Sequence, residues 1–345
     1  MRMISETKKR RTSARSRSTN LLLLALLPLA VFTGLVANTA GTRWGIHPSV
    51  FHGIAAFAVL ILSPWKQVIV RRGLGRRRKT SWISITLLVL VISTLTTGIM
   101  HAFGYQGRIG PLTLMQVHVG GALIALVLAY FHYRSHPVRF TRPVDANRRS
   151  FLKAAGVSVG AALTWIGLEG TLDALGASGG ERRFTGSHER GSFDPRGFPV
   201  TSWLDDRVQT IDADDWVLGI GGSTMSLADI DALPHEEFAA VLDCTSAWYT
   251  SQLWTGVRLD RLIDPGSDRA IVVRSQTGYS RRFPVSDIES LWLVTHVGGE
   301  PLSAGHGFPA RIVAPGRRGF WWVKWVTEID TSPVPWWIQL PFPAT

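Results

Sequence analysis

Cys244, the only cysteine of this 345-residue chain, is the residue whose surroundings most suggest chemistry. A single cysteine cannot form an internal disulfide, so it is either a small core residue or a ligand or nucleophile. It follows the apolar run 239–242, which would bring its sulfur to the mouth of a packed core. Soft metals favour a deprotonated thiolate as ligand. We therefore interpret Cys244 as a candidate metal ligand, with a buried structural cysteine as the alternative.

A cluster of basic side chains lies later in the chain. Its members fall within 19 positions and are interleaved with glycines: His306, Arg311, Arg317, Arg318 and Lys324. Arginine offers a planar fork and lysine a point charge, and glycines let backbone N–H groups approach an anion. The cluster therefore predicts a phosphate site. Arg311 and Lys324 are the strongest candidates, followed by His306, whereas Arg317 and Arg318 fit a solvated turn equally well.

Several motifs of the C-terminal half resemble, in order, those of the sulfite oxidase family, which includes the bacterial periplasmic molybdenum methionine-sulfoxide reductases. They are LDCTSAWY (242–249) with WTGVRL (254–259), TGYS (277–280), GHGFPAR (305–311), and PGRRG (315–319) with VKWV (323–326). The resemblance implies an α+β molybdopterin domain in which molybdenum is held by a pterin dithiolene, one protein thiolate, and oxo or water ligands. Cys244 would supply that thiolate.

The resemblance also suggests roles for neighbouring residues. Thr245 and Ser246 would donate hydrogen bonds to the metal's ligands. Tyr279 would bind a substrate oxygen, although a surface-loop tyrosine is an equal alternative. Arg281, with Arg274 and Arg282, would form a cationic pocket for sulfite. The direction of oxygen-atom transfer stays open between sulfite-type oxidation and sulfoxide-type reduction of a small-molecule substrate.

Charge divides the chain into two parts. Residues 1–165 carry 22 Lys/Arg and 2 acids, whereas residues 166–345 carry 15 Lys/Arg and 23 acids. The basic residues of the first part fall in three clusters between apolar runs, which is typical of membrane flanks. This pattern argues against a nucleic-acid partner.

Apolar runs predict four spans followed by a fifth anchoring helix, at about 20 residues per span. The runs are 21–39, 49–69, 82–103, 112–133 and 152–175. Because basic loops stay cytoplasmic, the N-terminus would be inside and the C-terminal domain on the extracytoplasmic side of the cell membrane. The sequence NRRSFLK (147–153) resembles a twin-arginine export signal, with an ordinary basic flank as the alternative.

Histidines within the predicted spans suggest a cofactor in the bundle. His52 and His118 lie at similar depth near the outer side and would ligate one haem b. The sequence offers no second histidine at the depth of His132, so we expect a single haem. The four-span region loosely resembles bacterial b-type cytochrome membrane domains, and a plain structural anchor is the alternative.

These patterns predict a domain organisation. We expect a basic tail (1–20), a four-helix membrane domain (21–135), a segment with the export-like motif, fifth span and linker (136–180), and a molybdopterin domain (181–345). Strands are expected at 215–220, 270–274, 291–295 and 310–313, with short helices at 226–233 and 258–263.

The predicted function is that of a membrane-anchored molybdopterin oxidoreductase that exchanges electrons, through haem b, with quinone or another redox protein. Two alternatives remain. In the first, the chain is a b-type electron-transfer subunit whose soluble domain only docks a partner. In the second, the soluble domain keeps the fold without activity and serves as a scaffold.

Overall fold

A computed structural model describes the backbone of residues 2–74, 81–110, 112–135, 137, 140, 147–203 and 206–340. The expected cytoplasmic basic segments lie partly outside these residues. The chain forms two compact units. One comprises Met1–Asn38 and Arg43–Gly186, and the other Thr39–Thr42 and Ser187–Thr345.

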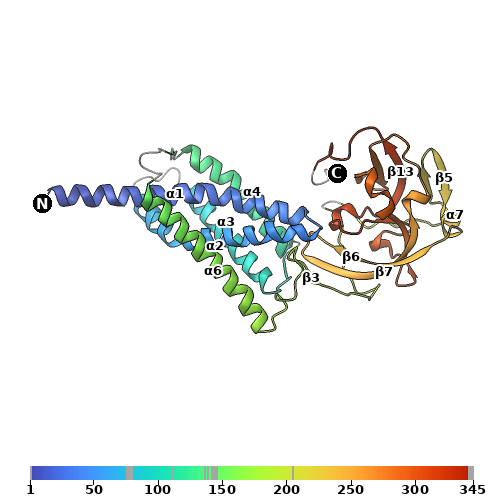
Figure 1. Ribbon diagram of the computed structural model, residues 1–345, viewed down its shortest axis with the longest axis horizontal. Coiled ribbons are helices and arrows are strands. Elements are labelled where there is room, and N and C mark those ends of the chain that lie inside the picture. Colours follow the sequence, from blue (N-terminus) through green and yellow to red (C-terminus); the bar gives the residue numbers. More distant parts are fainter. Residues whose placement is uncertain are drawn as a thin grey trace. The chain divides into compact units, whose positions relative to one another are not determined.

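Long apolar helices form the first unit (Figure 1). They are α1 (Arg2–Thr39), α2 (Ile46–Leu74), α3 (Ser81–Ala102), α4 (Leu114–Ser135) and α6 (Arg148–Ala174), with a 3-10 turn η1 (Arg43–Gly45) and the short strands β1 (Arg108–Ile109) and β2 (Leu112–Thr113). In the described part of the chain, five helices are long and apolar enough to cross a membrane. They coincide with the five predicted apolar runs.

Small residues allow these helices to approach closely. α3 packs along α4, and α2 packs along α6. A Cβ added at Gly53 of α2 would lie 2.1 Å from the Trp165 ring of α6. Helix α6 begins at the predicted arginine pair, because the Asn147 side chain caps it by accepting a hydrogen bond from the Ser150 N–H.

The second unit is built around two sheets. Among the described residues, a six-stranded sheet has the order β11-β10-β7-β3, with β12 on β10 and β6 on β7, and a five-stranded sheet has the order β5-β4-β13-β8-β9. The bounds of the first sheet's strands are β3 (His188–Glu189), β6 (Glu236–Asp243), β7 (Trp248–Arg258), β10 (Trp292–Val297), β11 (Glu300–Pro301) and β12 (Arg311–Val313). Those of the second are β4 (Val217–Ile220), β5 (Ser223–Ser226), β8 (Ala270–Ser275), β9 (Ser280–Pro284) and β13 (Val326–Ser332).

Short helices connect these strands. They are α7 (Leu227–Asp231) and the 3-10 turns η2 (Leu259–Arg261), η3 (Val285–Ser290), η4 (Ala304–His306) and η5 (Gly319–Trp321). The expected helix at 258–263 is therefore only a 3-10 turn. Residues 188–198 belong to this unit, since β3 pairs with β7 and Phe198 is buried in the core.

Apolar side chains from both sheets form one core, which includes Trp254, Leu293, Ile271 and Phe283. The antiparallel strands β6 and β7 pair from Glu236 with Gly256 to Asp243 with Tyr249. Cys244 lies in the turn between them, so the hairpin carries the candidate ligand to the edge of the core.

Candidate functional site

The turn between β6 and β7 holds Cys244 in a fixed position. The Cys244 N–H donates to the Trp248 carbonyl at 2.8 Å, and the Ala247 N–H donates to the Cys244 carbonyl at 3.1 Å. Ala247 has a φ of 73°, a left-handed conformation that costs energy for a residue with a side chain. The Ser246 N–H lies 3.4 Å from the Cys244 Sγ. The thiol is free and 8% exposed.

Burial raises the pKa of the Cys244 thiol, and the Ser246 N–H and the charge of Arg318 oppose this shift. A thiol in this environment becomes a thiolate when a metal replaces its proton. Thr245 and Ser246 are both half-buried beside it. The predicted group Cys244, Thr245 and Ser246 therefore shares one tight turn.

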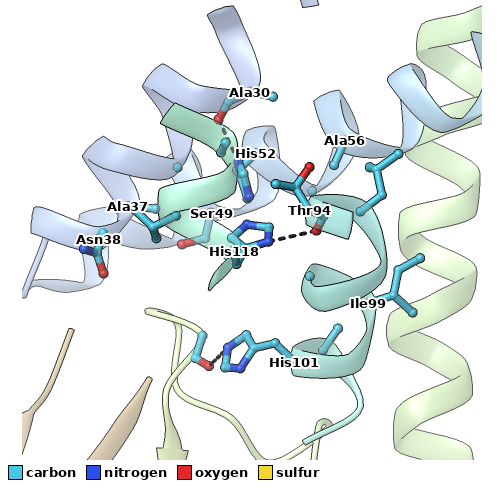
Figure 2. Close-up of a pocket in the computed structure, with 18 of the residues that line it drawn as sticks. Ala30, Ala37, Asn38, Ser49, His52, Ala56, Thr94, Ile99, His101 and His118 are labelled. Carbon is cyan, nitrogen blue, oxygen red and sulfur yellow. Dashed lines mark hydrogen bonds between the residues drawn. The ribbon is translucent and has the colours of Figure 1, made fainter. Parts of the chain in front are cut away.

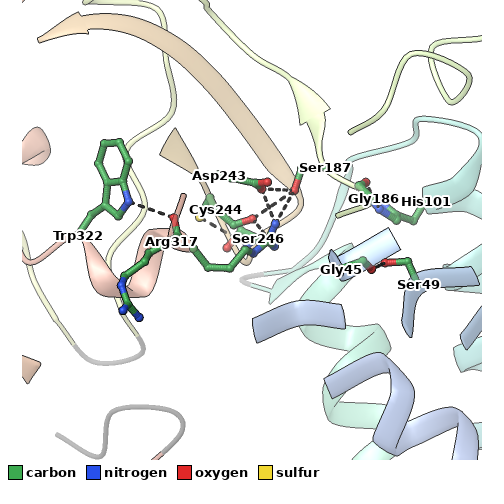
Figure 3. A network of polar contacts seen from close by, with 11 residues as sticks. Gly45, Ser49, His101, Gly186, Ser187, Asp243, Cys244, Ser246, Arg317 and Trp322 are labelled. Carbon is green, nitrogen blue, oxygen red and sulfur yellow. Dashed lines mark hydrogen bonds and ion pairs between the residues drawn. The ribbon is translucent and has the colours of Figure 1, made fainter. Parts of the chain in front are cut away.

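An ion pair that the sequence did not predict supports this turn. Figure 3 shows Asp243, Cys244 and Ser187 together at this turn. Arg318 pairs with Asp243, and its Nη2 donates to the Cys244 carbonyl at 3.0 Å. The Ser187 hydroxyl donates to the same Asp243 carboxylate at 2.7 Å. The signal available in the sequence was the acid directly before the cysteine, but nothing in it pointed to Arg318 as its partner.

Buried cations lie near Cys244. The Arg311 guanidinium is 1% exposed, stacks near the rings of Trp254 and Trp322, and donates to the carbonyls of His306 and Trp322. The Lys324 Nζ donates to the Thr201 carbonyl at 2.9 Å and to the Gly305 carbonyl at 2.6 Å. The structure thus buries one predicted phosphate-binding residue, Arg311, and places the half-buried Lys324 next to it.

Burial lowers the pKa of Arg311 to about 9, and burial together with the charge of Arg311 lowers that of Lys324 to about 7. The Arg311 charge interacts with Cys244 as well. Among the described residues, no carboxylate forms an ion pair with Arg311 or Lys324. Because a buried charge without a counter-ion is costly, this arrangement suits an anionic ligand.

His306 is satisfied by protein partners. Its Nε2 lies 3.2 Å from the Phe198 carbonyl, its Nδ1 lies 2.9 Å from the Ser303 hydroxyl, and its ring stacks on Phe198. Burial, with the charges of Arg311 and Lys324, lowers its pKa to about 4, so the ring is neutral. In this arrangement His306 orders the loop that receives the Arg311 guanidinium.

A second cationic region surrounds the ring of Trp321. The Arg281 guanidinium lies 4.1 Å from the centroid of this ring, and the Arg317 guanidinium 4.5 Å from it. Arg317 forms an ion pair with Asp287, whereas Arg281 is 2% exposed and has no carboxylate partner among the described residues. Burial and the charge of Arg317 lower the pKa of Arg281 to about 10. Arg281 is therefore a further buried cation that suits an anion.

The other members of the expected sulfite pocket lie elsewhere. Arg274 is exposed and paired with Glu328, and the half-exposed Arg282 donates to the Ile338 carbonyl. Tyr279 is buried and its hydroxyl donates to the Phe320 carbonyl. Burial raises the pKa of this phenol, so it acts as a donor. Of the three predicted pocket arginines, only Arg281 is buried.

Unpartnered nitrogens test whether an anionic cofactor fits. In the described part of the chain, the buried Nε atoms of Arg281, Arg311 and Arg318 have no hydrogen-bond partner. Glycines keep the space open, since a Cβ at Gly307, whose φ is +110°, would meet Arg311 and Lys324 at 3.1 Å. The residues present therefore fit a ligand that carries several acceptor oxygens.

A different site lies in the helical unit. His52 of α2 and His118 of α4 face each other with ring centroids 5.9 Å apart and planes at 89° (Figure 2). The Nδ1 of His52 lies 2.8 Å from the Ala30 carbonyl, and that of His118 lies 2.9 Å from the Thr94 carbonyl. Since each Nδ1–H donates to a carbonyl, each Nε2 keeps the lone pair that a metal binds.

These histidines line a largely apolar cavity of about 610 Å³ within the helical unit. Its wall comes from α1, α2, α3, α4, α6 and residues 180–186. Glycines make room for the rings, since a Cβ at Gly34 would lie 2.9 Å from His52 and one at Gly98 would lie 3.0 Å from His118. His101 also lines the cavity, with its Nε2 2.8 Å from the Gly186 carbonyl.

Comparison with known proteins gives the C-terminal unit its family. Residues 205–336 match the oxidoreductase molybdopterin binding domain. The chain is 26% identical over 113 residues to the uncharacterized oxidoreductase YuiH of Bacillus subtilis, which covers 31% of this chain and 57% of that protein. It is 25% identical over 167 residues to human mitochondrial sulfite oxidase, which covers 36% of this chain and 31% of that protein.

The match thus spans about half or less of the length of these relatives. Among solved structures, the sulfane dehydrogenase SoxCD of Paracoccus pantotrophus matches with a TM-score of 0.34 and 21% identity, over 37% of this chain and 40% of that one. The ordered motifs and the domain match agree on the same segment. Residues 205–336 form an oxidoreductase molybdopterin-binding domain of the sulfite oxidase type.

Proposed function

We propose that this chain is a membrane-anchored, molybdopterin-dependent oxidoreductase that transfers an oxygen atom to or from a small substrate. The observation that carries the proposal is the sole cysteine, held in a tight turn near buried cations that have no carboxylate partner among the described residues. Cys244 would ligate molybdenum, and Arg311 and Lys324 would bind the anionic pterin, with His306 ordering their loop. Arg317, a further predicted pterin ligand, is paired with Asp287 and would have to give up this ion pair to bind it. When bound, the cofactor supplies the oxygen-atom and electron transfer.

The residues around Trp321 would select the substrate. Arg281 is the buried cation there that has no carboxylate partner among the described residues, and it supports an oxyanion such as sulfite. Oxidation of the substrate would pass two electrons to the bound cofactor. Tyr279, bound to the Phe320 carbonyl, would order the wall beside Arg281.

Reduction of a sulfoxide is the second candidate. The packing of Trp321 against Phe283, Phe320 and Trp336 supports it, because an aromatic wall suits an apolar thioether. Turnover of sulfite and of a neutral sulfoxide by the same preparation separates the two reactions. The favoured reaction is the one whose kcat/KM is higher by more than tenfold.

The helical unit would hold the chain in the cell membrane and carry electrons. Paired imidazoles with free Nε2 atoms, carbonyl-bound Nδ1 atoms and a cavity within the usual size range of ligand sites support a haem b ligated by His52 and His118. Quinone or another redox protein would exchange electrons with this haem. The basic segments support an extracytoplasmic location for the C-terminal domain.

One preparation tests the proposal. Full-length protein, purified in detergent from a host that makes molybdopterin, should contain molybdenum near one atom per chain and show a haem b optical spectrum. Cys244→Ser should lose molybdenum and activity but keep the haem spectrum and its far-ultraviolet circular dichroism. A haem spectrum without molybdenum would instead support an electron-transfer subunit with a non-catalytic docking domain.

A further inference from the structure

We propose that Arg318 is a positioning residue that fixes the turn carrying Cys244, through its ion pair with Asp243 and its hydrogen bond to the Cys244 carbonyl. The inference rests on the proposed role of Cys244 as the metal ligand. Arg318 was grouped with its neighbour Arg317 as a candidate phosphate ligand. The proposal instead gives Arg318 a role in holding the turn.

Three residues converge on the turn. Arg318 and Asp243 form an almost fully buried ion pair, and the Arg318 Nη1 also lies 3.3 Å from the Ser187 hydroxyl. The other end of the guanidinium donates to the Cys244 carbonyl at 3.0 Å. A planar fork satisfies the carboxylate and the carbonyl together, which a point charge does not.

The backbone beside Arg318 meets the same turn. Asp243 and Arg318 form an isolated parallel β-bridge. A Cβ at Gly319 would lie 3.2 Å from the Cys244 Cα and 3.4 Å from the Asp243 carbonyl oxygen. The start of η5 therefore packs on the end of β6. The backbone bridge and the Arg318 side chain make the contacts, and the absence of a side chain at Gly319 allows the close approach.

The contacts serve position more than stability. A buried ion pair contributes little net stability, because desolvation offsets the attraction. The turn they hold includes Ala247 in the left-handed region, a conformation that persists only where the surroundings impose it. A clamp on the adjacent carbonyl would orient the Cys244 sulfur toward a bound metal, and contacts that orient a ligand would tune that metal.

The sole cysteine allows a direct test that needs no metal. The full-length chain, made in a host that lacks the pterin, is folded in detergent and treated with iodoacetamide, which can label only Cys244. The rates are compared at their high-pH plateau, where the thiol is fully ionised, because the Arg318 charge also lowers the pKa of Cys244. There Arg318→Met should raise the labelling rate by about 10- to 100-fold, the factor expected for losing hydrogen bonds to a charged group. Arg318→Lys should give an intermediate rate. Arg196→Met, which breaks an exposed ion pair with Glu300, should leave the rate unchanged.

A double variant separates positioning from folding. Asp243→Asn with Arg318→Met removes both charges, so it avoids the stranded carboxylate that destabilises the single variant. Its melting temperature should return toward that of the wild type. Labelling of Cys244 should stay fast, because the hydrogen bond to the Cys244 carbonyl is still missing. A labelling rate equal to the wild type, in either this variant or a folded Arg318→Met, would overturn the proposal.

The metal-loaded protein gives a second readout. Arg318→Met should keep its molybdenum content but show an additional Mo(V) species by electron paramagnetic resonance, which Arg196→Met should not show. A single unchanged Mo(V) signal would count against the clamp. Absence of molybdenum from the wild type would instead contradict the proposed function. The labelling rates would still test the role of Arg318, because they do not require the metal.

Discussion

The imidazoles of His52 and His118 meet edge to face, with ring centroids 5.9 Å apart. Each ring is anchored through Nδ1 to a backbone carbonyl on another helix, His52 to Ala30 of α1 and His118 to Thr94 of α3. Four helices thereby fix two nitrogen lone pairs. Such carbonyl contacts orient metal-binding histidines.

Replacing either histidine should remove the optical signal of the proposed haem b. His52→Ala and His118→Ala should each lose the reduced-minus-oxidised optical bands of a b-type haem, because bis-histidine ligation needs both nitrogens. His47→Gln serves as the control, since His47 is exposed at the start of α2. A normal spectrum in either alanine variant would rule that residue out as a ligand.

The glycines beside the histidines give a finer prediction. In Gly34→Ala the new methyl group would lie 2.9 Å from the His52 ring, so the ring must tilt and the haem spectrum or its midpoint potential should shift. In Gly156→Ala nothing lies within 4 Å of the new methyl group. This control should keep the spectrum and gain helix stability of up to about 1 kcal/mol. Identical spectra for the two variants would contradict the tight packing of the ring.

Hydropathy predicted the helical unit well, because a membrane-spanning helix needs only length and apolar side chains. The five helices coincide with the predicted runs, including α6 at the arginine pair. Four expected strands correspond to β4, β8, β10 and β12. The β6–β7 hairpin was missed, since its buried positions include Thr250 and Gln252, whose polar side chains mask the alternation of a half-buried strand.

The candidate site was predictable only where neighbours in sequence stay neighbours in space. Thr245 and Ser246 flank Cys244 in one turn, as the motif suggested. The partner of Asp243 lies 75 positions away, and only the docking of η5 on β6 identifies it. Arg274 was grouped with Arg281 and Arg282 as a cationic pocket that the family resemblance implies, but it lies exposed on β8 and pairs with Glu328.

Acid should destabilise the cofactor-free C-terminal domain through His306. The folded pKa of this group is about 4 against an ordinary value of 6.5, so between these values the unfolded chain binds more protons. The contribution of neutral His306 to the free energy of unfolding is therefore complete above pH 6.5. It is lost as the pH falls toward 4, and the loss amounts to about 3 kcal/mol. Urea unfolding of the full-length chain at each pH, monitored by tryptophan fluorescence, measures this loss of stability.

His306→Gln is the matched variant for that measurement, because glutamine does not titrate. Its free energy of unfolding should change less between pH 6.5 and 4 than that of the wild type. Parallel pH dependences for the two proteins would show that His306 does not contribute.

Arg281 should determine the preference for an anionic substrate. It is buried beside Trp321 and has no carboxylate partner in the part of the chain that the structure describes, so Arg281→Met should lower kcat/KM for sulfite by about 10- to 100-fold, the cost of losing hydrogen bonds to a charged group. Turnover of a neutral sulfoxide should change less, because that substrate carries no charge to pair. Arg282→Met is the control, since the Arg282 side chain is half-exposed and donates to the Ile338 carbonyl. Equal losses for both substrates would mean that Arg281 supports the fold of the wall, and no loss for either would remove it from the substrate site.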